Sequence, residues 1–209
     1  MTPEALVEFK AQLEERHRAA MELVSDLGPA SADAASTNHK DDAFAEAIFL
    51  RAFTAYESDV ERLFLHYVTG GSSLHGEAAH SFLSITDETH ARRLIKAANK
   101  FLYWAKPQDI KVTAETYIER GWPLVDMLAT STHILADCER IRNRIAHNSQ
   151  EAVQQFAIVQ RNYLGTERLF PITPGQFLRI RSTRRRKLHL AHFLETLAGT
   201  LGAIIEPAP

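Results

Sequence analysis

Residues 41–68 have the sequence DDAFAEAIFLRAFTAYESDVERLFLHYV, and this stretch decides the fold class. Its apolar residues recur three or four positions apart, which is the spacing that places side chains on one face of a helix. They are Phe44, Ile48, Phe49, Ala52, Phe53, Tyr56, Val60, Leu63, Phe64 and Tyr67. So wide a stripe is typical of a helix in the centre of a bundle. Asp41 and Asp42 suit the positive N-terminal end of a helix, and Gly70-Gly71 favours its end, so we expect a helix at 41–68.

Amphipathic segments on both sides of this stretch predict further helices, at 3–27, 87–104, 131–147, 151–163 and 187–204. In the helix at 87–104 we expect Leu94 and Ala97 to face inward. Only 169–181, with the sequence LFPITPGQFLRIR, has strand or turn character, and its Pro174-Gly175 pair indicates a surface turn. Short connections between amphipathic helices favour antiparallel neighbours. The fold class expected is therefore all-α, an up-and-down helical bundle with little or no β structure.

The chain length of 209 residues suits one well-filled core. We expect a single domain over residues 1–209, with its core at about 40–180. The linker at 30–40 separates the first helix from the rest, and the helices at 3–27 and 187–204 are expected to pack on the core.

Composition excludes several classes of protein. Hydrophobic residues make up 45% of the chain and charged residues 24%, ordinary values for a globular domain, and the formal net charge is −2. The single cysteine, Cys138, cannot form an internal disulfide, and the ten histidines show no zinc-ligand spacing, so we expect neither a metal nor a cofactor. No apolar stretch reaches the roughly eighteen residues of a membrane span. The charged N-terminal segment lacks the apolar stretch of a signal peptide, so the expected location is the cytoplasm.

The segment RNRIAH, residues 142–147, closes the helix expected at 131–147. Ile134, Cys138, Ile141 and Ile145 form the apolar stripe of that helix. Asn143 and His147 are four positions apart, so they lie on one face, away from the stripe. The long side chain of Arg142 can reach the same end of the helix.

These three residue types suit cleavage of an RNA phosphodiester. An imidazole is the side chain suited to proton transfer near neutral pH, so His147 can accept the proton of a 2′-hydroxyl. The guanidinium of Arg142 matches phosphate oxygens and stabilises negative charge, and Asn143 can orient the imidazole or bind a phosphate oxygen. The alternative interpretation is a solvated helix end, where basic residues favour the negative pole of the helix dipole. The spacing alone is weak evidence, because Arg184 and His189 repeat it.

The segment Arg142-Asn143-Arg144-Ile145-Ala146-His147 resembles the Arg-Asn-x-x-x-His signature of the HEPN superfamily, which consists of helical-bundle proteins common in prokaryotic toxin and defence systems. The resemblance covers about residues 40–180. It implies that Arg142, Asn143 and His147 are active residues and that the sites of two protomers meet at a two-fold axis. RNA is then cut without metal, leaving a 2′,3′-cyclic phosphate. Glu57 matches an acidic residue that often faces the cleft in this family.

The later stretch PITPGQFL, residues 171–178, resembles a bacterial branch of the same superfamily, the RiboL-PSP-HEPN group. Some members of the superfamily are catalytically inactive. The resemblance therefore implies either an active ribonuclease or a silent dimer of the same fold.

The densest positive run of the chain lies between Arg179 and Lys187. It contains Arg179, Arg181, Arg184, Arg185, Arg186 and Lys187. One interpretation is a phosphate-binding arm in which Arg184, Arg185, Arg186 and Lys187, together with Arg144, add affinity for RNA of any sequence. The other interpretation is a solvated loop and helix start.

Two classes of function follow. The first is a metal-independent endoribonuclease that works as a toxin or phage-defence effector, with RNA as substrate and an antitoxin or defence-system protein as partner. A homodimer is expected because each chain offers one histidine at the site, while the reaction needs both a base and an acid. The second class is a catalytically inactive HEPN-like dimer that binds RNA, nucleotide or a partner protein, as an antitoxin or scaffold does. A weaker alternative is a DNA-binding regulator, for which no helix-turn-helix spacing is present.

Overall fold

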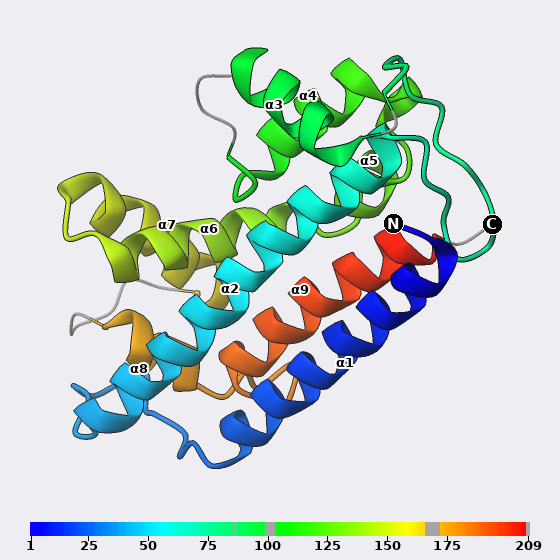
Figure 1. Ribbon diagram of the computed structural model, residues 1–209. Coiled ribbons are helices and arrows are strands. Elements are labelled where there is room, and N and C mark those ends of the chain that lie inside the picture. The colour runs from blue at the N-terminus through cyan, green and yellow to red at the C-terminus, as the bar shows by residue number, and fades with distance from the viewer. Residues whose placement is uncertain (86, 99–102, 166–171, 208–209) are drawn as a thin grey trace. The chain divides into compact units, whose positions relative to one another are not determined.

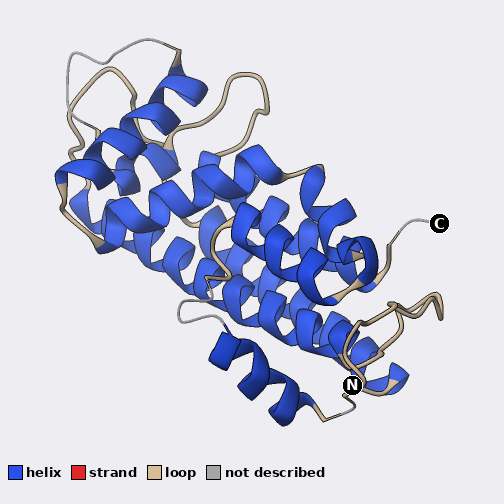
Figure 2. Cartoon of the chain, turned by 90° about the horizontal axis from the view of Figure 1, so that it is seen from above, coloured by secondary structure: helices blue, strands red, loops and turns tan. Residues whose placement is uncertain are grey.

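The computed structural model describes residues 1–85, 87–98, 103–165 and 172–207, and Figure 1 labels their helices. These residues form nine α-helices, one short 3-10 helix and isolated β-bridges, with neither a strand nor a sheet (Figure 2). The helices are α1 (Pro3–Ser25), α2 (His39–Val68), α3 (Glu88–Ala98), α4 (Pro107–Tyr117), the 3-10 helix (Glu119–Gly121), α5 (Leu124–Ala129), α6 (Thr132–Ala146), α7 (Gln150–Leu164), α8 (Pro174–Arg179) and α9 (His189–Ile205). The expected all-α helical bundle is confirmed.

The central helix α2 begins two residues before its predicted start and ends at the predicted residue, Val68. Asp41 and Asp42 lie in its first turn, where their charges favour the positive end of the helix dipole. Between Ile48 and Tyr67 every residue of the predicted stripe is buried except the half-buried Ala52, whereas Phe44 is 42% exposed. Burial of nearly the whole stripe explains why a strongly apolar helix lies at the centre of the fold.

The chain divides into two compact units. Unit 1 comprises Met1–Glu15, Ala55–Leu135 and Ala198–Pro209. Its core is built around α2, where the ring of Phe64 lies 5.1 Å from Trp104. The hydroxyl of Tyr67 donates a hydrogen bond of 2.6 Å to the carbonyl of Ile204 in α9. Because this hydroxyl is buried, the bond spares unit 1 an unsatisfied polar group.

Unit 2 comprises Arg16–Thr54 and Ala136–Leu197. Its core is a cluster of aromatic rings from α2, α7, α8 and α9, namely Phe49, Phe53, Phe156, Phe177 and Phe193. Phe156 and Phe177 meet edge to face with their centroids 5.6 Å apart, an arrangement that adds to the free energy of area burial. These contacts hold α7, α8 and α9 around the first half of α2.

Two sequence-based predictions are wrong. In α3 the buried side chains are Ala91 and Ile95, whereas Leu94 is 43% exposed and Ala97 is also exposed. The apolar residues of this helix fit two registers, and the packing selects the one that buries the β-branched Ile95. Of the predicted helix 87–104, residues 99–102 lie outside the described part, and Tyr103 and Trp104 are not helical.

The second wrong prediction concerns the stretch 169–181, whose residues Pro174–Arg179 form helix α8 instead of a strand or turn. Residues 169–171 lie outside the described part, and Ile180 and Arg181 form isolated β-bridges. The hydroxyl of Thr173 accepts the N–H of Gln176 at 3.1 Å, and Pro174 occupies the first turn, where its missing N–H costs nothing. Pro174 and Gly175 are buried rather than forming a surface turn. A Cβ at Gly175 would lie 2.3 Å from the carbonyl oxygen of Asp42, so only glycine permits this close approach of α8 to α2.

Candidate active site

Helix α6 carries the candidate catalytic residues at its C-terminal end. Its buried side chains include Cys138 and Ile141, while Ile134 and Ile145, at the two ends of the predicted apolar stripe, are half-buried. Arg142 and Asn143 are half-buried, and His147, the first residue after the helix, is exposed. The end of α6 therefore carries two half-buried polar side chains, followed by an accessible imidazole.

A chain of hydrogen bonds orients Asn143 and Arg142. The amide nitrogen of Asn143 donates to Glu139 Oε1 at 3.2 Å, one helical turn earlier. With its nitrogen engaged there, the amide oxygen of Asn143 faces Arg142 and accepts a hydrogen bond of 3.1 Å from Nη1. Glu139 thus fixes the orientation of Asn143, and Asn143 in turn restrains the Arg142 guanidinium without neutralising its charge.

The backbone holds His147 in place. Its N–H donates to the carbonyl of Asn143 at 2.8 Å, which extends the helical hydrogen bonding by one residue. Its carbonyl accepts a bond of 3.4 Å from Arg144 Nη1. Ser149 then caps the start of α7, because its hydroxyl accepts the N–H of Ala152 at 3.2 Å. His147 therefore lies in a short, capped connection between two helices.

Helix α7 is fastened to α6 next to the candidate site. Arg140 Nη1 donates to the buried carboxylate of Asp137 at 2.7 Å, and its Nε donates to Gln155 Oε1 of α7 at 3.2 Å. Arg140 is thus held by structural partners in both α6 and α7.

Glu57 lies in the part of α2 that belongs to unit 1 and is half-buried, whereas Arg142, Asn143 and His147 belong to unit 2. Its predicted place beside the signature residues stays a prediction.

An acidic residue that sequence reasoning missed is Glu46, also on α2 but in unit 2. Its Oε1 accepts the N–H of Gly175 at 2.8 Å. Burial raises the pKa of this carboxyl, the neighbouring Asp42 raises it further, and the positive charge of Arg144 lowers it. Glu46 thus joins α2 to α8 through its bond with Gly175. Its position one turn after Asp42 was the only signal in the sequence, and many acidic residues share such spacing.

The basic side chains of residues 179–187 fall into three groups: one is buried, two contact another side chain, and three are exposed. Arg179 is 4% exposed and is bound to Asp41 and Asp42, so it does not belong to a phosphate-binding arm. The guanidinium of Arg185 lies 5.6 Å from the ring centroid of Tyr163, and Lys187 forms an ion pair with Glu195.

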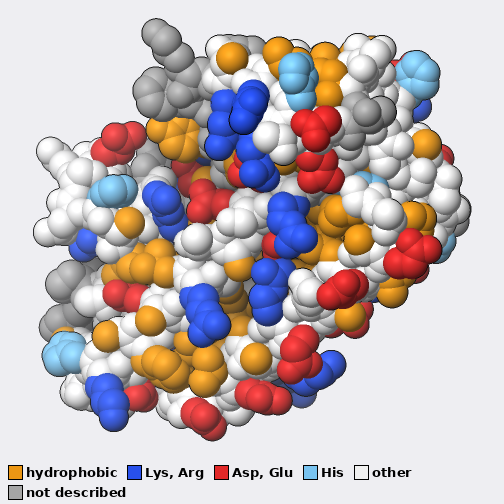
Figure 3. All heavy atoms as spheres, viewed as in Figure 1, with side chains coloured by type: hydrophobic (Ala, Val, Ile, Leu, Met, Phe, Trp, Pro, Cys, Tyr) orange, Lys and Arg blue, Asp and Glu red, His pale blue; other side chains and the backbone are white. Residues whose placement is uncertain are grey.

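Arg181, Arg184 and Arg186 are exposed. They lie in a tight turn in which Ser182 N–H donates to the carbonyl of Lys187 at 2.9 Å and Arg186 N–H to that of Ser182 at 2.8 Å. On the face of the molecule shown in Figure 3, basic side chains are interspersed with acidic and apolar ones, in keeping with the net charge of −2. Because the chain has no overall positive charge, affinity for a polyanion requires a local group of cationic side chains, such as the arginines of this turn.

The remaining candidate residues, Cys138, His189 and His192, are buried. Burial raises the pKa of the Cys138 thiol, which suits a core residue rather than a nucleophile. Burial lowers the pKa of His189 and of His192 to about 4, so both are neutral at pH 7. His189 Nδ1 donates to the carbonyl of Phe177 at 3.2 Å, which makes it a packing residue.

Within the described ranges, no three His, Cys, Asp or Glu side chains lie close enough to hold a metal ion. None of the helices in the same ranges is long and apolar enough to span a membrane. Compared with protein-family models, curated proteins and solved structures, the chain matches none.

Proposed function

We propose that this chain is a metal-independent endoribonuclease of the HEPN type that works as a homodimer. The observation that carries the proposal is the end of α6, where the exposed His147 follows an Arg142 guanidinium held by a neutral amide. The accessible imidazole of His147 can transfer protons, and the guanidinium of Arg142 supplies positive charge for a phosphate. The resemblance of residues 142–147 to the HEPN signature supports the same conclusion.

In the proposed reaction, the imidazole of His147 accepts the proton of an RNA 2′-hydroxyl while the 2′-oxygen bonds to the adjacent phosphorus. The bond from phosphorus to the 5′-oxygen breaks, which leaves a 2′,3′-cyclic phosphate on one product. The 5′-oxygen takes a proton from a second imidazole, supplied by the other protomer. Arg142 stabilises the charge on the phosphoryl oxygens, and Asn143 positions Arg142.

The biological role that fits this activity is a toxin or phage-defence effector in the cytoplasm, restrained by a neutralising partner protein. Cleavage that needs no metal would proceed wherever RNA is accessible, so a cell would require such restraint.

Purified protein is expected to cleave a mixed RNA pool in the presence of EDTA and to leave cyclic-phosphate ends. Arg142→Ala should lower the rate by about 100-fold or more, because one donor to the transition-state charge is lost. Arg161→Ala is the matched control, since Arg161 is an exposed arginine of α7, and its rate should stay unchanged.

Light scattering should give a dimer, and a monomer that cleaves RNA would contradict the proposal. RNA binding without cleavage would instead support the catalytically inactive class.

The exposed arginines of the 181–187 turn should add affinity for RNA without sequence preference. Arg184→Ala and Arg186→Ala should each reduce the slope of log affinity against log salt by about 0.7 for single-stranded RNA, because each removes one phosphate contact. Titrations of a fluorescent RNA at several salt concentrations measure the slope. An equal reduction in Arg161→Ala would show that the turn has no special part in binding.

A further inference from the structure

The hydrogen bonds on the two sides of Asn143 have a fixed polarity. The carboxylate of Glu139 can only accept hydrogen bonds, and the guanidinium of Arg142 can only donate them. Between them, Asn143 donates from Nδ2 to Glu139 Oε1 at 3.2 Å and accepts at Oδ1 from Arg142 Nη1 at 3.1 Å. The reversed amide would set its N–H groups against the guanidinium and its oxygen against the carboxylate. Both neighbours therefore favour the same orientation of the Asn143 amide.

These three residues lie on a single helix, α6, so helical geometry brings them together. Glu139 precedes Asn143 by four positions, which places the two side chains on one face, one turn apart. The long side chain of Arg142 reaches the amide from the adjacent position. All three side chains are half-buried, and a hydrogen bond that is partly shielded from water is electrostatically stronger than an exposed one.

The orientation of the amide determines how Arg142 is held. The bond from Nη1 to Asn143 uses one of the five N–H donors of the guanidinium, and the others can face a phosphate. A guanidinium that is already restrained loses less freedom when a phosphate binds, and a donor fixed in advance stabilises the charge of the transition state best. A reversed amide would offer Arg142 a second set of donors and could not restrain it.

We propose that Glu139 is a positioning residue for the candidate active site: its carboxylate sets the orientation of Asn143, and Asn143 holds Arg142 ready for a phosphate. The kinetic part of this inference rests on the proposed ribonuclease function. The structural part concerns three side chains of α6 and is tested without RNA.

NMR of the full chain tests the structural part. In Glu139→Ala the side-chain N–H protons of Asn143 should exchange with water about tenfold faster, the size expected for loss of one hydrogen bond to a charged group. Alanine is the best helix former, so α6 should persist, and the backbone amide of Ile141 should exchange as in the wild type. Glu139→Gln keeps an acceptor oxygen and should give an intermediate rate. Unchanged exchange of the Asn143 side chain in Glu139→Ala would overturn the proposal.

The kinetic part is tested with RNA. In Glu139→Ala the kcat for cleavage should fall about tenfold, less than in Arg142→Ala, because the guanidinium is still present but less well placed. Glu139→Gln should recover part of this loss. Removal of a negative charge near a polyanion would by itself lower KM and leave kcat unchanged. Glu151→Ala, which removes an exposed carboxylate at the start of α7, is the control for that charge effect.

A double-mutant cycle tests whether Glu139 acts through Asn143. Asn143→Ala alone should lower kcat about tenfold, and Glu139→Ala/Asn143→Ala should lower it no further, because both substitutions break the same chain of bonds. If the two losses multiply to about 100-fold, Glu139 acts by another route and the proposal is wrong. If the wild type cleaves no RNA, the proposed function fails, while the exchange of the Asn143 side chain still decides whether Glu139 orients the amide.

Discussion

Replacement of Arg179 by methionine is expected to lower the free energy of unfolding by about 3–5 kcal/mol, the typical cost of breaking a buried ion pair from one side. The guanidinium is 4% exposed and lies 2.6 Å from Asp42 and 3.3 Å from Asp41. Its Nε also donates to the carbonyl of Gly28 at 2.9 Å, and Nη1 to that of Asn38 at 3.2 Å. Methionine fills much of the same volume, so the loss reports the stranded charge of Asp42 and the unpaired carbonyls rather than a cavity.

Urea unfolding measures this effect. Arg181→Met is the matched control, because Arg181 is exposed two residues along the same run and its loss should cost less than about 0.5 kcal/mol. The double variant Arg179→Met/Asp42→Asn should recover part of the stability, since it no longer buries an uncompensated carboxylate. Equal losses in Arg179→Met and Arg181→Met would show that the network does not stabilise the fold.

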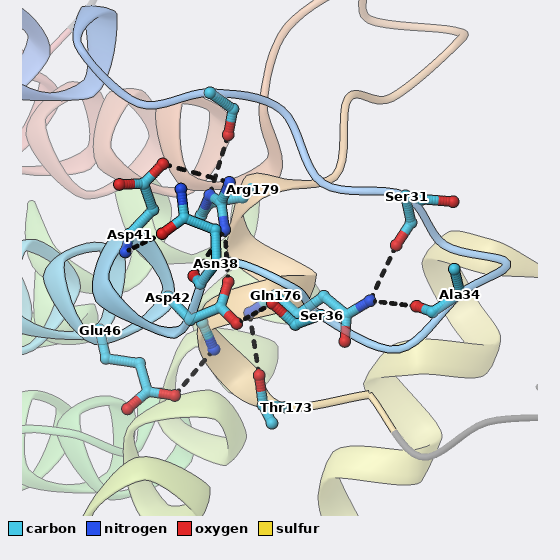
Figure 4. A network of polar contacts seen from close by, with 12 residues as sticks. Ser31, Ala34, Ser36, Asn38, Asp41, Asp42, Glu46, Thr173, Gln176 and Arg179 are labelled. Carbon is cyan, nitrogen blue, oxygen red and sulfur yellow. Dashed lines mark hydrogen bonds and ion pairs between the residues drawn. The ribbon is translucent and has the colours of Figure 1, made fainter.

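The same network closes the segment between α1 and α2. Gln176 Nε2 donates to the carbonyl of Ser31 at 2.9 Å and to that of Ala34 at 2.7 Å (Figure 4). Ala30 N–H donates to the carbonyl of Arg179 at 3.1 Å. The sequence correctly predicts a linker over most of 30–40, because its residues are small and polar, although His39 and Lys40 already belong to α2. Its attachment depends on two buried polar side chains that lie far along the chain, and no local pattern reveals that.

The long helix and its buried stripe were predictable because a helix of this length repeats its apolar pattern many times. Helix α8 was not, although Thr173 and Pro174 form an ordinary helix start, because its six residues hold too few turns to show a period. Arg179 was assigned to the exposed basic run for a related reason. Charge density along the sequence cannot distinguish a solvated arginine from one buried against two aspartates.

At the candidate site, the sequence predicted what one helix determines by itself. The end of α6 and the cap at Ser149 follow from residue types in consecutive positions. The bond from Gly175 to Glu46 depends on how α2 and α8 pack in unit 2. Contacts between residues far apart in the chain leave no pattern in the local sequence, so only the structure identifies Glu46.

His147→Ala is expected to lower the rate of RNA cleavage by about 100-fold to 10,000-fold, the range for loss of a general acid or base. In a two-fold dimer one substitution removes both imidazoles, so base and acid are lost together. Folding should be unaffected, because the side chain is exposed and its backbone bonds to Asn143 and Arg144 do not involve the imidazole.

His133→Ala is the matched control, because His133 is an exposed histidine in the first turn of the same helix, and its activity should equal that of the wild type. RNA affinity, measured in parallel, should change little in His147→Ala, since Arg142 and the 181–187 turn keep their charges. That separation of binding from cleavage assigns His147 to proton transfer. Wild-type activity in His147→Ala would exclude the imidazole from the reaction and remove the main support for the ribonuclease proposal.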